Sequence, residues 1–264
     1  MTPVAQPLSH RSRLPRVGRA GLGLLLLASA CSSSNNGPAA TSAISSERND
    51  AFERLDASTR VVAEFRADVP EAVAAEARCV VVFPALVQGG LVVGGRGGRG
   101  FADCLRRGAD WSQPAPVSVS GGSFGAQIGV EKVDVLMLVM NDEAKNALLE
   151  GHFTVGVDAS AAAGPVGSEA SKDFKVSSGV LSYARTSGLF AGAAFSGAKI
   201  SRDDDATQAL YGGLPELRSL LQGPITSPGA PADRFVAAVR SAFGANARAA
   251  AAASLKRTGG LETR

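Results

Sequence analysis

Apolar positions along the first half of the chain follow two different periods, one helical and one extended. Between residues 46 and 66 they recur near the spacing of an α-helix, with Ser45 or Ser46 available as the N-cap. Proline is tolerated in the first turn of a helix, so Pro70 can open a second short helix over residues 71–78. The apolar positions that indicate the first helix and its end are Phe52, Leu55, Val62, Phe65 and Val69.

The pattern changes to β-prone segments at Cys79. Short runs of branched and aliphatic residues are separated by Pro84 and by glycines, a spacing typical of strands. One run, at residues 123–130, alternates apolar and small or polar residues with the period of two of a strand. Strands are therefore expected at residues 79–83, 86–93, 100–105, 117–120, 123–130, 133–140, 153–160 and 180–200, the last of them bent at Ser187-Gly188.

Three further helices are expected within and after the strand region. Asn141 or Asp142 can cap one that is closed by Gly151. Residues 203–210 form a second, short helix, and Asp233 caps a C-terminal amphipathic one. The strands mostly lack helical crossovers, so the sequence predicts an α+β fold, mainly an antiparallel β-sheet or barrel, Gly-rich, with N-terminal and C-terminal helices. The apolar face of the last helix consists of Phe235, Val239 and Phe243.

The first thirty residues have the composition of an export signal. Four arginines precede a short apolar run at residues 20–30, and none of the thirty is acidic. This run is about half of the ~20 residues that a membrane-spanning helix requires. Its end, LASAC at residues 27–31, resembles the lipobox of bacterial lipoproteins, in which the cysteine thiol carries a diacylglycerol. We therefore expect residues 1–30 to be a lipoprotein signal peptide and Cys31 to be acylated; an ordinary signal peptide with a chance cysteine is the alternative.

Two regions of different composition follow the signal. Residues 31–46 are rich in Ser, Asn, Gly and Pro, cannot bury much apolar surface, and are predicted to form a disordered tether. A flexible stretch of this length spans roughly 20 Å on average. Residues 47–258 are long enough for a sizeable core and are predicted to form a single domain.

Removal of the signal changes the charge of the protein. The full chain has 27 basic and 24 acidic residues, a net charge of +3. Without the signal the basic residues number 23 against 24, a net charge of −1. The basic character of the full sequence is therefore no indication of nucleic-acid binding. The arginines that are removed are Arg11, Arg13, Arg16 and Arg19.

Three blocks of the β-prone region resemble one protein family, the SYLF domain. They are VFPALVQGG at residues 82–90, GSFGAQIG at residues 122–129 and YARTSGLFAG at residues 183–192. The blocks occur in the order of the family, and their spacing covers the chain from about Asp50 to Phe243.

This resemblance implies a lipid-binding module. Eukaryotic members bind phosphoinositides and some bundle actin filaments, whereas bacterial members are commonly secreted lipoproteins. The phosphoinositide-binding helix of the eukaryotic members has no counterpart here, because the equivalent stretch is signal peptide and tether. Actin is not expected as a partner either, because a bacterial envelope contains none.

A glycine-rich segment at residues 95–100 satisfies the pattern G-x-G-x-x-G. A dinucleotide site would require a helix directly after this pattern, and the residues that follow are β-prone, so tight turns in a glycine-rich sheet are favoured. Glycine N–H groups beside Arg96 and Arg99 can instead bind a lipid phosphate. Arg106 and Arg107 can extend the same basic rim; the alternative is that all four are solvated loop charges.

Candidates for catalysis or metal binding are few. His152 is the single histidine after the signal, and no G-x-S-x-G motif accompanies it. The acidic run at residues 203–205 lacks the spaced ligands of a calcium loop and is better interpreted as a helix start. Gln127 is interpreted as a core amide. The sequence therefore predicts no enzyme activity, no metal and no cofactor.

Two cysteines remain after the lipidated one. Cys79 and Cys104 lack the paired cysteine or histidine spacing of a zinc site. Export to an oxidising compartment permits a disulfide, so we predict that they are bonded to each other. Two buried free thiols are the alternative.

The sequence is compatible with two functions. The first is a membrane-anchored envelope lipoprotein whose SYLF-like domain binds anionic headgroups of membrane lipids. Ser32 stands where an aspartate often retains lipoproteins in the inner membrane, so the outer membrane, facing the periplasm, is the expected location. The alternative is a structural or protein-interaction module of the envelope with no specific lipid ligand, and the sequence identifies no protein partner.

Overall fold

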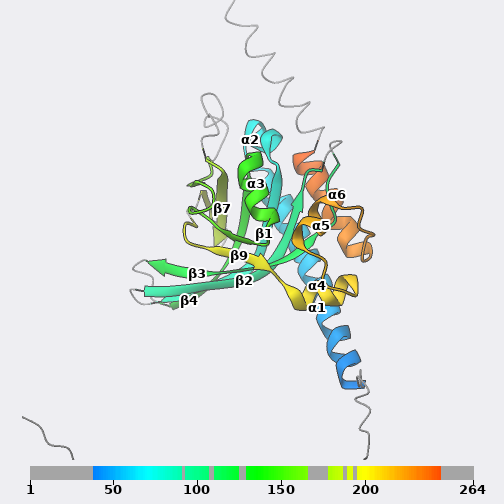
Figure 1. Ribbon diagram of the computed structural model, residues 1–264. Helices are drawn as coiled ribbons and strands as arrows, with labels where there is room; N and C mark the ends of the chain where they lie inside the picture. The colour runs from blue at the N-terminus through cyan, green and yellow to red at the C-terminus, as the bar shows by residue number, and fades with distance from the viewer. Residues whose placement is uncertain are drawn as a thin grey trace, which may run out of the picture. The chain divides into compact units, whose positions relative to one another are not determined.

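A nine-stranded β-sheet forms the centre of the structure, and helices pack on both of its faces (Figure 1). The computed structural model describes residues 38–90, 93–106, 110–124, 129–165, 178–186, 189–192 and 195–244. The strand order is β5-β9-β3-β2-β1-β4-β7-β6, with β8 also paired to β7, and every pair is antiparallel except β6 with β7. The predicted α+β class, a mainly antiparallel sheet with helices at both ends of the chain, is confirmed.

The described residues form nine strands and six helices. The strands are β1 (Cys79–Gly90), β2 (Val93–Cys104), β3 (Ala115–Phe124), β4 (Gly129–Val139), β5 (His152–Thr154), β6 (Ala161–Ala163), β7 (Val180–Thr186), β8 (Leu189–Gly192) and β9 (Lys199–Arg202). The helices are α1 (Pro38–Arg66), α2 (Glu71–Glu76), α3 (Asp142–Leu149), α4 (Asp204–Tyr211), α5 (Leu217–Gln222) and α6 (Ala230–Phe243).

The first helix is longer than its apolar periodicity indicates. It begins at Pro38 rather than at residue 46, so it occupies part of the segment predicted to be a tether. A proline fits the first turn of a helix, and the Ser45 hydroxyl donates to the carbonyl oxygen of Thr41 at 2.9 Å. The side chains of residues 41–46 are exposed. An extension that buries nothing leaves no periodic apolar signal in the sequence.

The hairpin of β1 and β2 replaces three shorter strands that the sequence predicts. Residues 79–90 form one strand because the chain passes Pro84 through a bulge, where Ala85 has a φ of 52° and the register with β2 shifts. The Ala85 N–H donates to the Asp134 carboxylate of β4 at 2.8 Å. A bulge lets a strand continue past a proline, because the unpaired residues need no partner in the ladder.

Other boundaries differ from the prediction by a few residues. The strand predicted at residues 123–130 is divided between the end of β3 and the start of β4, and residues 125–128 lie outside the described residues. The strand predicted at residues 153–160 is reduced to β5, which pairs only with β9. Helix α5 was not predicted, because six residues with buried Leu217, Leu220 and Leu221 are too short to show a period.

The caps of three helices follow simple local chemistry. Asn141 accepts from the Ala144 N–H and caps α3, and Asp203 accepts from the Ala206 N–H and caps α4, as the sequence predicts. Helix α6 instead begins at Ala230, with Gly229 at the N-cap and a proline in the first turn. The prediction of Asp233 as its cap is therefore wrong, and Asp233 lies within the first turn.

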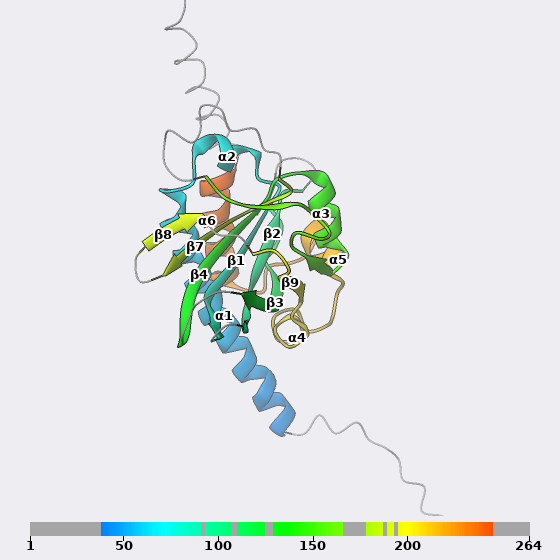
Figure 2. The ribbon, with the colours of Figure 1, turned by 90° about the vertical axis from the view of Figure 1, so that its left-hand side faces the viewer.

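Two hydrophobic layers lie on opposite faces of the sheet. On one face, α1, α2, α4 and α6 pack against alternate residues of the central strands, such as Val80, Val82 and Phe101. On the other face, α3 and α5 pack against the intervening residues, such as Val81 and Ala102. Strand β1 is therefore apolar on both sides over residues 79–83. Figure 2 shows the central strands side by side, with α3 and α5 near one edge.

The far ends of β2, β3 and β4 project beyond the helices (Figure 1). At that end the sheet is rich in glycine, and β1 pairs through Gly89 and Gly90 with Gly95 and Gly94 of β2. No helix within the described ranges is long and apolar enough to cross a membrane.

Candidate functional site

The four candidate arginines do not form one basic rim, because strand geometry separates them. Arg96 and Arg99 lie within β2 rather than in a loop of tight turns. They are three residues apart, so their side chains point to opposite faces of the sheet. Arg106 lies beyond the opposite end of β2, and Arg107 lies outside the described residues. The predicted rim of all four residues is therefore wrong.

Arg99 is committed to the interior of the domain. Its guanidinium donates to the Asp203 carboxylate, with one bond of 2.8 Å, and to the two oxygens of Glu47 at 2.6 and 3.1 Å. The bonds to Asp203 and Glu47 raise the pKa of Arg99, although burial opposes the shift. Burial would raise the pKa of Asp203, but its bonds with Arg99 lower it overall. Arg99 thus links β2 to α1 and to the start of α4, and it is not available to a ligand.

Arg96 has the opposite character, because it pairs with no carboxylate among the described residues. The residues beside it in the sheet are Gly121 of β3 and Gln88 of β1, and Gln88 donates to Glu131 at 2.6 Å. The guanidinium carbon of Arg96 lies 4.9 Å from the ring centroid of Phe195. Its Nε is buried without a hydrogen-bond partner, and within the described residues Arg96 makes no ion pair. Burial lowers its pKa.

Exposed apolar side chains lie at the same end of the sheet. Val87 pairs with Lys132 and Gly89 with Val130, so Val87, Val130 and Lys132 share one face. Val87 is 42% exposed and Val130 is 78% exposed. We call this end of β1 to β4 the sheet tip; Val87, Val130 and Lys132 lie on one of its faces and Arg96 on the other.

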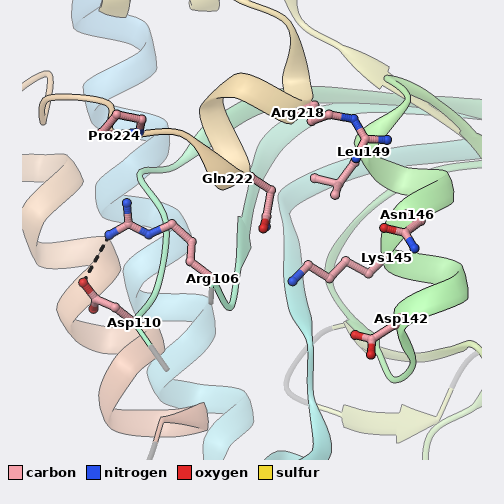
Figure 3. Close-up of a pocket in the computed structure, with 9 residues that line it drawn as sticks. All are labelled: Arg106, Asp110, Asp142, Lys145, Asn146, Leu149, Arg218, Gln222 and Pro224. Atoms are coloured by element: carbon pink, nitrogen blue, oxygen red, sulfur yellow. Dashed lines mark hydrogen bonds and ion pairs between the residues drawn. The ribbon is translucent and has the colours of Figure 1, made fainter. Parts of the chain in front are cut away.

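Arg106 belongs to a separate pocket between α3 and α5. This space of about 990 Å³ is shown in Figure 3 and is called the α3–α5 pocket. Its charged residues are three cations and two carboxylates, and its remaining lining consists of two amides and two apolar residues. The lining residues are Arg106, Asp110, Asp142, Lys145, Asn146, Leu149, Arg218, Gln222 and Pro224.

Several candidates from the sequence have structural roles. Cys79 and Cys104 lie directly opposite each other in β1 and β2 and form the predicted disulfide, with 4.0 Å between their Cα atoms. His152 starts β5 and is exposed. Asp203 caps α4, and the described residues contain no group of three or more side chains that could hold a metal ion. Cys31 and Gln127 lie outside the described residues.

The helix predicted over residues 46–66 cannot offer its apolar face to a ligand. Leu55, Val62 and Phe65 are fully buried against the sheet and α6. On its flanks, Arg234 of α6 bonds to Asp56, and Arg185 of β7 bonds to Glu64 and Asp68. The apolar face of α1 is therefore part of the core.

Asp103 is a buried carboxyl group that the sequence analysis did not single out. It faces the layer of α1 and α6, between Phe101 and Leu105, and accepts from the Ser112 hydroxyl at 2.7 Å. Its second oxygen has no hydrogen-bond partner within the described residues. Burial raises its pKa to about 8. Asp103 lies two residues after Phe101, and alternate residues of a strand share one face of the sheet. This spacing could have identified Asp103 as a buried residue.

Residues 120–242 match the family model named Ysc84, whose description is "Las17-binding protein actin regulator". This part of the chain belongs to the Ysc84, or SYLF, family. The matched residues include β4, β7, the helices from α3 to α5 and all but the last residue of α6. The family assignment made from three sequence blocks is confirmed.

The similarity extends to curated eukaryotic proteins. The chain is 32% identical over 167 residues to an SH3 domain-containing protein of Schizosaccharomyces pombe, covering 61% of this chain and 39% of that protein. It is 29% identical over 148 residues to Protein YSC84 of Saccharomyces cerevisiae, covering 54% and 32%. It is 29% identical over 147 residues to the SH3 domain-containing YSC84-like protein 1 of Xenopus laevis, covering 54% and 44%.

The aligned region is therefore less than half of each of these relatives. No solved structure matches the chain. Within the SYLF domain, the region matched by the family model contains Lys145 and Arg218 but not Arg96, Arg99 or Arg106. Lys145 and Arg218 were not singled out from the sequence, because their approach to Arg106 depends on how α3 and α5 pack.

Proposed function

We propose that the protein is a lipoprotein anchored to the cell envelope through Cys31, and that its SYLF domain binds an anionic lipid surface through the sheet tip. The anchor and the outer-membrane location are expectations from residues 1–32. The observation that carries the lipid proposal is Arg96, a partly buried guanidinium without a counter-ion among the described residues.

A desolvated cation without a counter-ion is unfavourable, and a lipid phosphate would supply the missing negative charge. Stacking on Phe195 holds the guanidinium of Arg96 in one orientation, so little side-chain entropy would be lost on binding. The connections that join β1 to β2 and β3 to β4, residues 91–92 and 125–128, contain no charged residue that could repel a phosphate.

Exposed apolar groups beside a cation are typical of surfaces that contact the headgroup region of a membrane. Val130 and Val87 can enter the boundary between headgroups and acyl chains, while Lys132 on the same face remains near the phosphates. Each basic residue near an anionic membrane adds about 1 kcal/mol of attraction. Two valines and two cations give weak binding, which is sufficient for a domain that an acyl anchor keeps close to the bilayer.

Vesicle sedimentation tests this proposal with the full chain carrying Cys31→Ala, so that an acyl group does not contribute. Arg96→Gln should weaken association with vesicles containing phosphatidylglycerol by about fivefold at low salt. The loss should shrink as salt rises, because screening already weakens the contact of the unchanged Arg96. Val130→Ser should weaken association at every salt concentration, because apolar insertion is not screened.

Arg60→Gln is the matched control, because it removes one exposed positive charge from α1, away from the tip. If Arg96→Gln and Arg60→Gln bind equally, the sheet tip is not the lipid-binding surface. If the Cys31→Ala protein does not sediment with anionic vesicles at all, lipid binding by the domain is refuted.

A second candidate function is a protein-docking module in the envelope. The family description names Las17 binding and actin regulation, so binding to proteins is a property ascribed to relatives. The exposed Val87 and Val130 of the sheet tip are also suited to a protein partner. This candidate gains support if the tip variants leave vesicle binding unchanged but abolish cross-linking to an envelope protein in cells.

A further inference from the structure

We propose that the α3–α5 pocket binds the anionic group of a small, water-soluble, hydroxylated molecule, such as a phosphate or carboxylate ester of a polyol. This site is distinct from the sheet tip. Arg96 is near the start of β2 and Arg106 follows its end, so about nine strand residues, roughly 30 Å, separate the two.

The charge of the pocket favours an anion. Arg106, Lys145 and Arg218 face it from three different segments, and its carboxylates are already engaged by cations that do not line it. Asp110 pairs with Arg240 at 2.6 Å, as well as with Arg106 at 3.1 Å. The second carboxylate, of Asp142, is 3.7 Å from Arg78.

Backbone carbonyl groups help to position two of the cations, Arg106 and Lys145, and Arg106 also pairs with Asp110. Arg106 donates to the carbonyl oxygen of Gly223 at 3.3 Å, and Lys145 donates to the carbonyl oxygen of Leu105. In Figure 3 the side chains of Lys145 and Gln222 extend toward the space beside Arg106. Arg218 is exposed and makes no ion pair in the part of the chain that the structure describes.

The lining also indicates the class of ligand. Only Leu149 and Pro224 among the lining residues are apolar, so the pocket offers little surface to an acyl chain. Asn146 and Gln222 supply amide donors and acceptors suited to hydroxyl groups. Guanidinium and ammonium groups beside such amides fit an oxyanion on a polyol, which a soluble molecule or a lipid headgroup could present.

A titration observed by NMR tests the site with the full chain carrying Cys31→Ala. Inorganic phosphate and glycerol 3-phosphate are added separately at low ionic strength. We expect saturable shifts of backbone amides in α3 and α5, with tighter binding of glycerol 3-phosphate because its hydroxyls reach the amide side chains. Arg218→Gln should weaken both ligands by about tenfold, as expected for loss of one charge-assisted hydrogen bond. Arg60→Gln, which removes the same charge elsewhere, should leave both unchanged.

The possible results separate this proposal from the lipid proposal. Absence of saturable shifts, or equal binding by the Arg218→Gln and Arg60→Gln proteins, overturns the pocket assignment. Loss of vesicle association in Arg218→Gln but not in Arg96→Gln also overturns it, because the pocket would then be the lipid headgroup site. Normal phosphate binding by Arg96→Gln supports the assignment whether or not that variant still binds vesicles.

Discussion

Charged side chains between the sheet and α1 differ in how their charge is compensated. Arg99 is surrounded by the carboxylates of Asp203 and Glu47, so an ion pair is retained in a partly buried place. Burial raises the pKa of Asp103 to about 8, although hydrogen bonds from the Ser112 hydroxyl and from backbone N–H groups, and the charge of Arg106, oppose the shift. At neutral pH, Asp103 is therefore mostly protonated in the folded protein, whereas in the unfolded chain it is ionised.

The raised pKa of Asp103 predicts a specific dependence of stability on pH. Between about pH 4 and pH 8, the folded state retains a proton on Asp103 that the unfolded chain has already released. The contribution of Asp103 to the free energy of unfolding is thus fully present below about pH 4. It falls between about pH 4 and pH 8 and is constant at higher pH. Asp103→Asn mimics the neutral acid, so the variant should lose this dependence and gain on the order of 1–3 kcal/mol relative to wild type at pH 9.

Urea unfolding of wild type and Asp103→Asn at pH 5, 7 and 9 would measure the effect, since the difference between the two proteins removes the contribution of all other groups. A constant difference at the three pH values would mean that Asp103 titrates near its ordinary value and that the buried carboxyl is compensated by another group.

The glycines of β2 differ in how closely neighbouring atoms approach them. At the bulge of β1, a Cβ atom on Gly100 of β2 would overlap the carbonyl oxygen of Val82 and lie 2.8 Å from Cδ1 of Phe83. At Gly95 of the same strand, the nearest atom to a Cβ would be the carbonyl oxygen of Gly121, at 4.0 Å. Packing therefore requires glycine at position 100 and not at position 95.

Alanine substitutions in β2 test this distinction. Gly100→Ala should lower the free energy of unfolding by about 1–3 kcal/mol, because the strands must separate to admit the methyl group. Gly95→Ala should be neutral or slightly stabilising, since alanine loses less conformational freedom than glycine on folding. Thermal unfolding followed by circular dichroism gives both values. Equal destabilisation by the two changes would show that the bulge adapts and that Gly100 is not a packing constraint.

On the scale of the whole molecule, the two proposed ligand sites lie at opposite ends of β2. A domain attached to a membrane by the sheet tip would present the α3–α5 pocket away from the bilayer. Helix α1 begins at Pro38, so only six residues, 32–37, lie between Cys31 and the helix. Even a fully extended chain of six residues spans at most roughly 20 Å, so an acyl anchor at Cys31 would keep the N-terminal end of α1 within that distance of the membrane.

Removal of the acylated cysteine tests the anchor itself. Cys31→Ala should abolish incorporation of a labelled fatty acid and move the protein from the membrane fraction to the soluble fraction after a high-salt wash. The physical reason is that each buried methylene of an acyl chain contributes about 0.8 kcal/mol, far more in total than two valines and two cations. A Cys31→Ala protein that stays in the washed membrane pellet, or wild type without the label, would contradict the anchor.

Local sequence determined much of the fold because local interactions produce it. The succession of β-prone runs without helical crossovers and the caps at Asn141 and Asp203 indicated an antiparallel sheet with flanking helices. The disulfide was also predictable from the sequence, since the expected acylation of Cys31 would leave two cysteines and one pairing. The exposed start of α1 and the short α5 were missed because neither has enough buried periodic residues to produce a signal.

The tertiary structure alone decided what each arginine does. Charge acts between groups that are close in space, and the partners of these arginines are distant in sequence. Arg99 meets Glu47 and Asp203 because α1 and α4 pack on its face of the sheet, whereas Arg96 points to the other face and stacks on Phe195. Both arginines belong to one glycine-rich run of the sequence. Because side chains of β2 alternate between two packed layers, Arg99 forms a structural ion pair, whereas Arg96 has no ion-pair partner in the part of the chain that the structure describes.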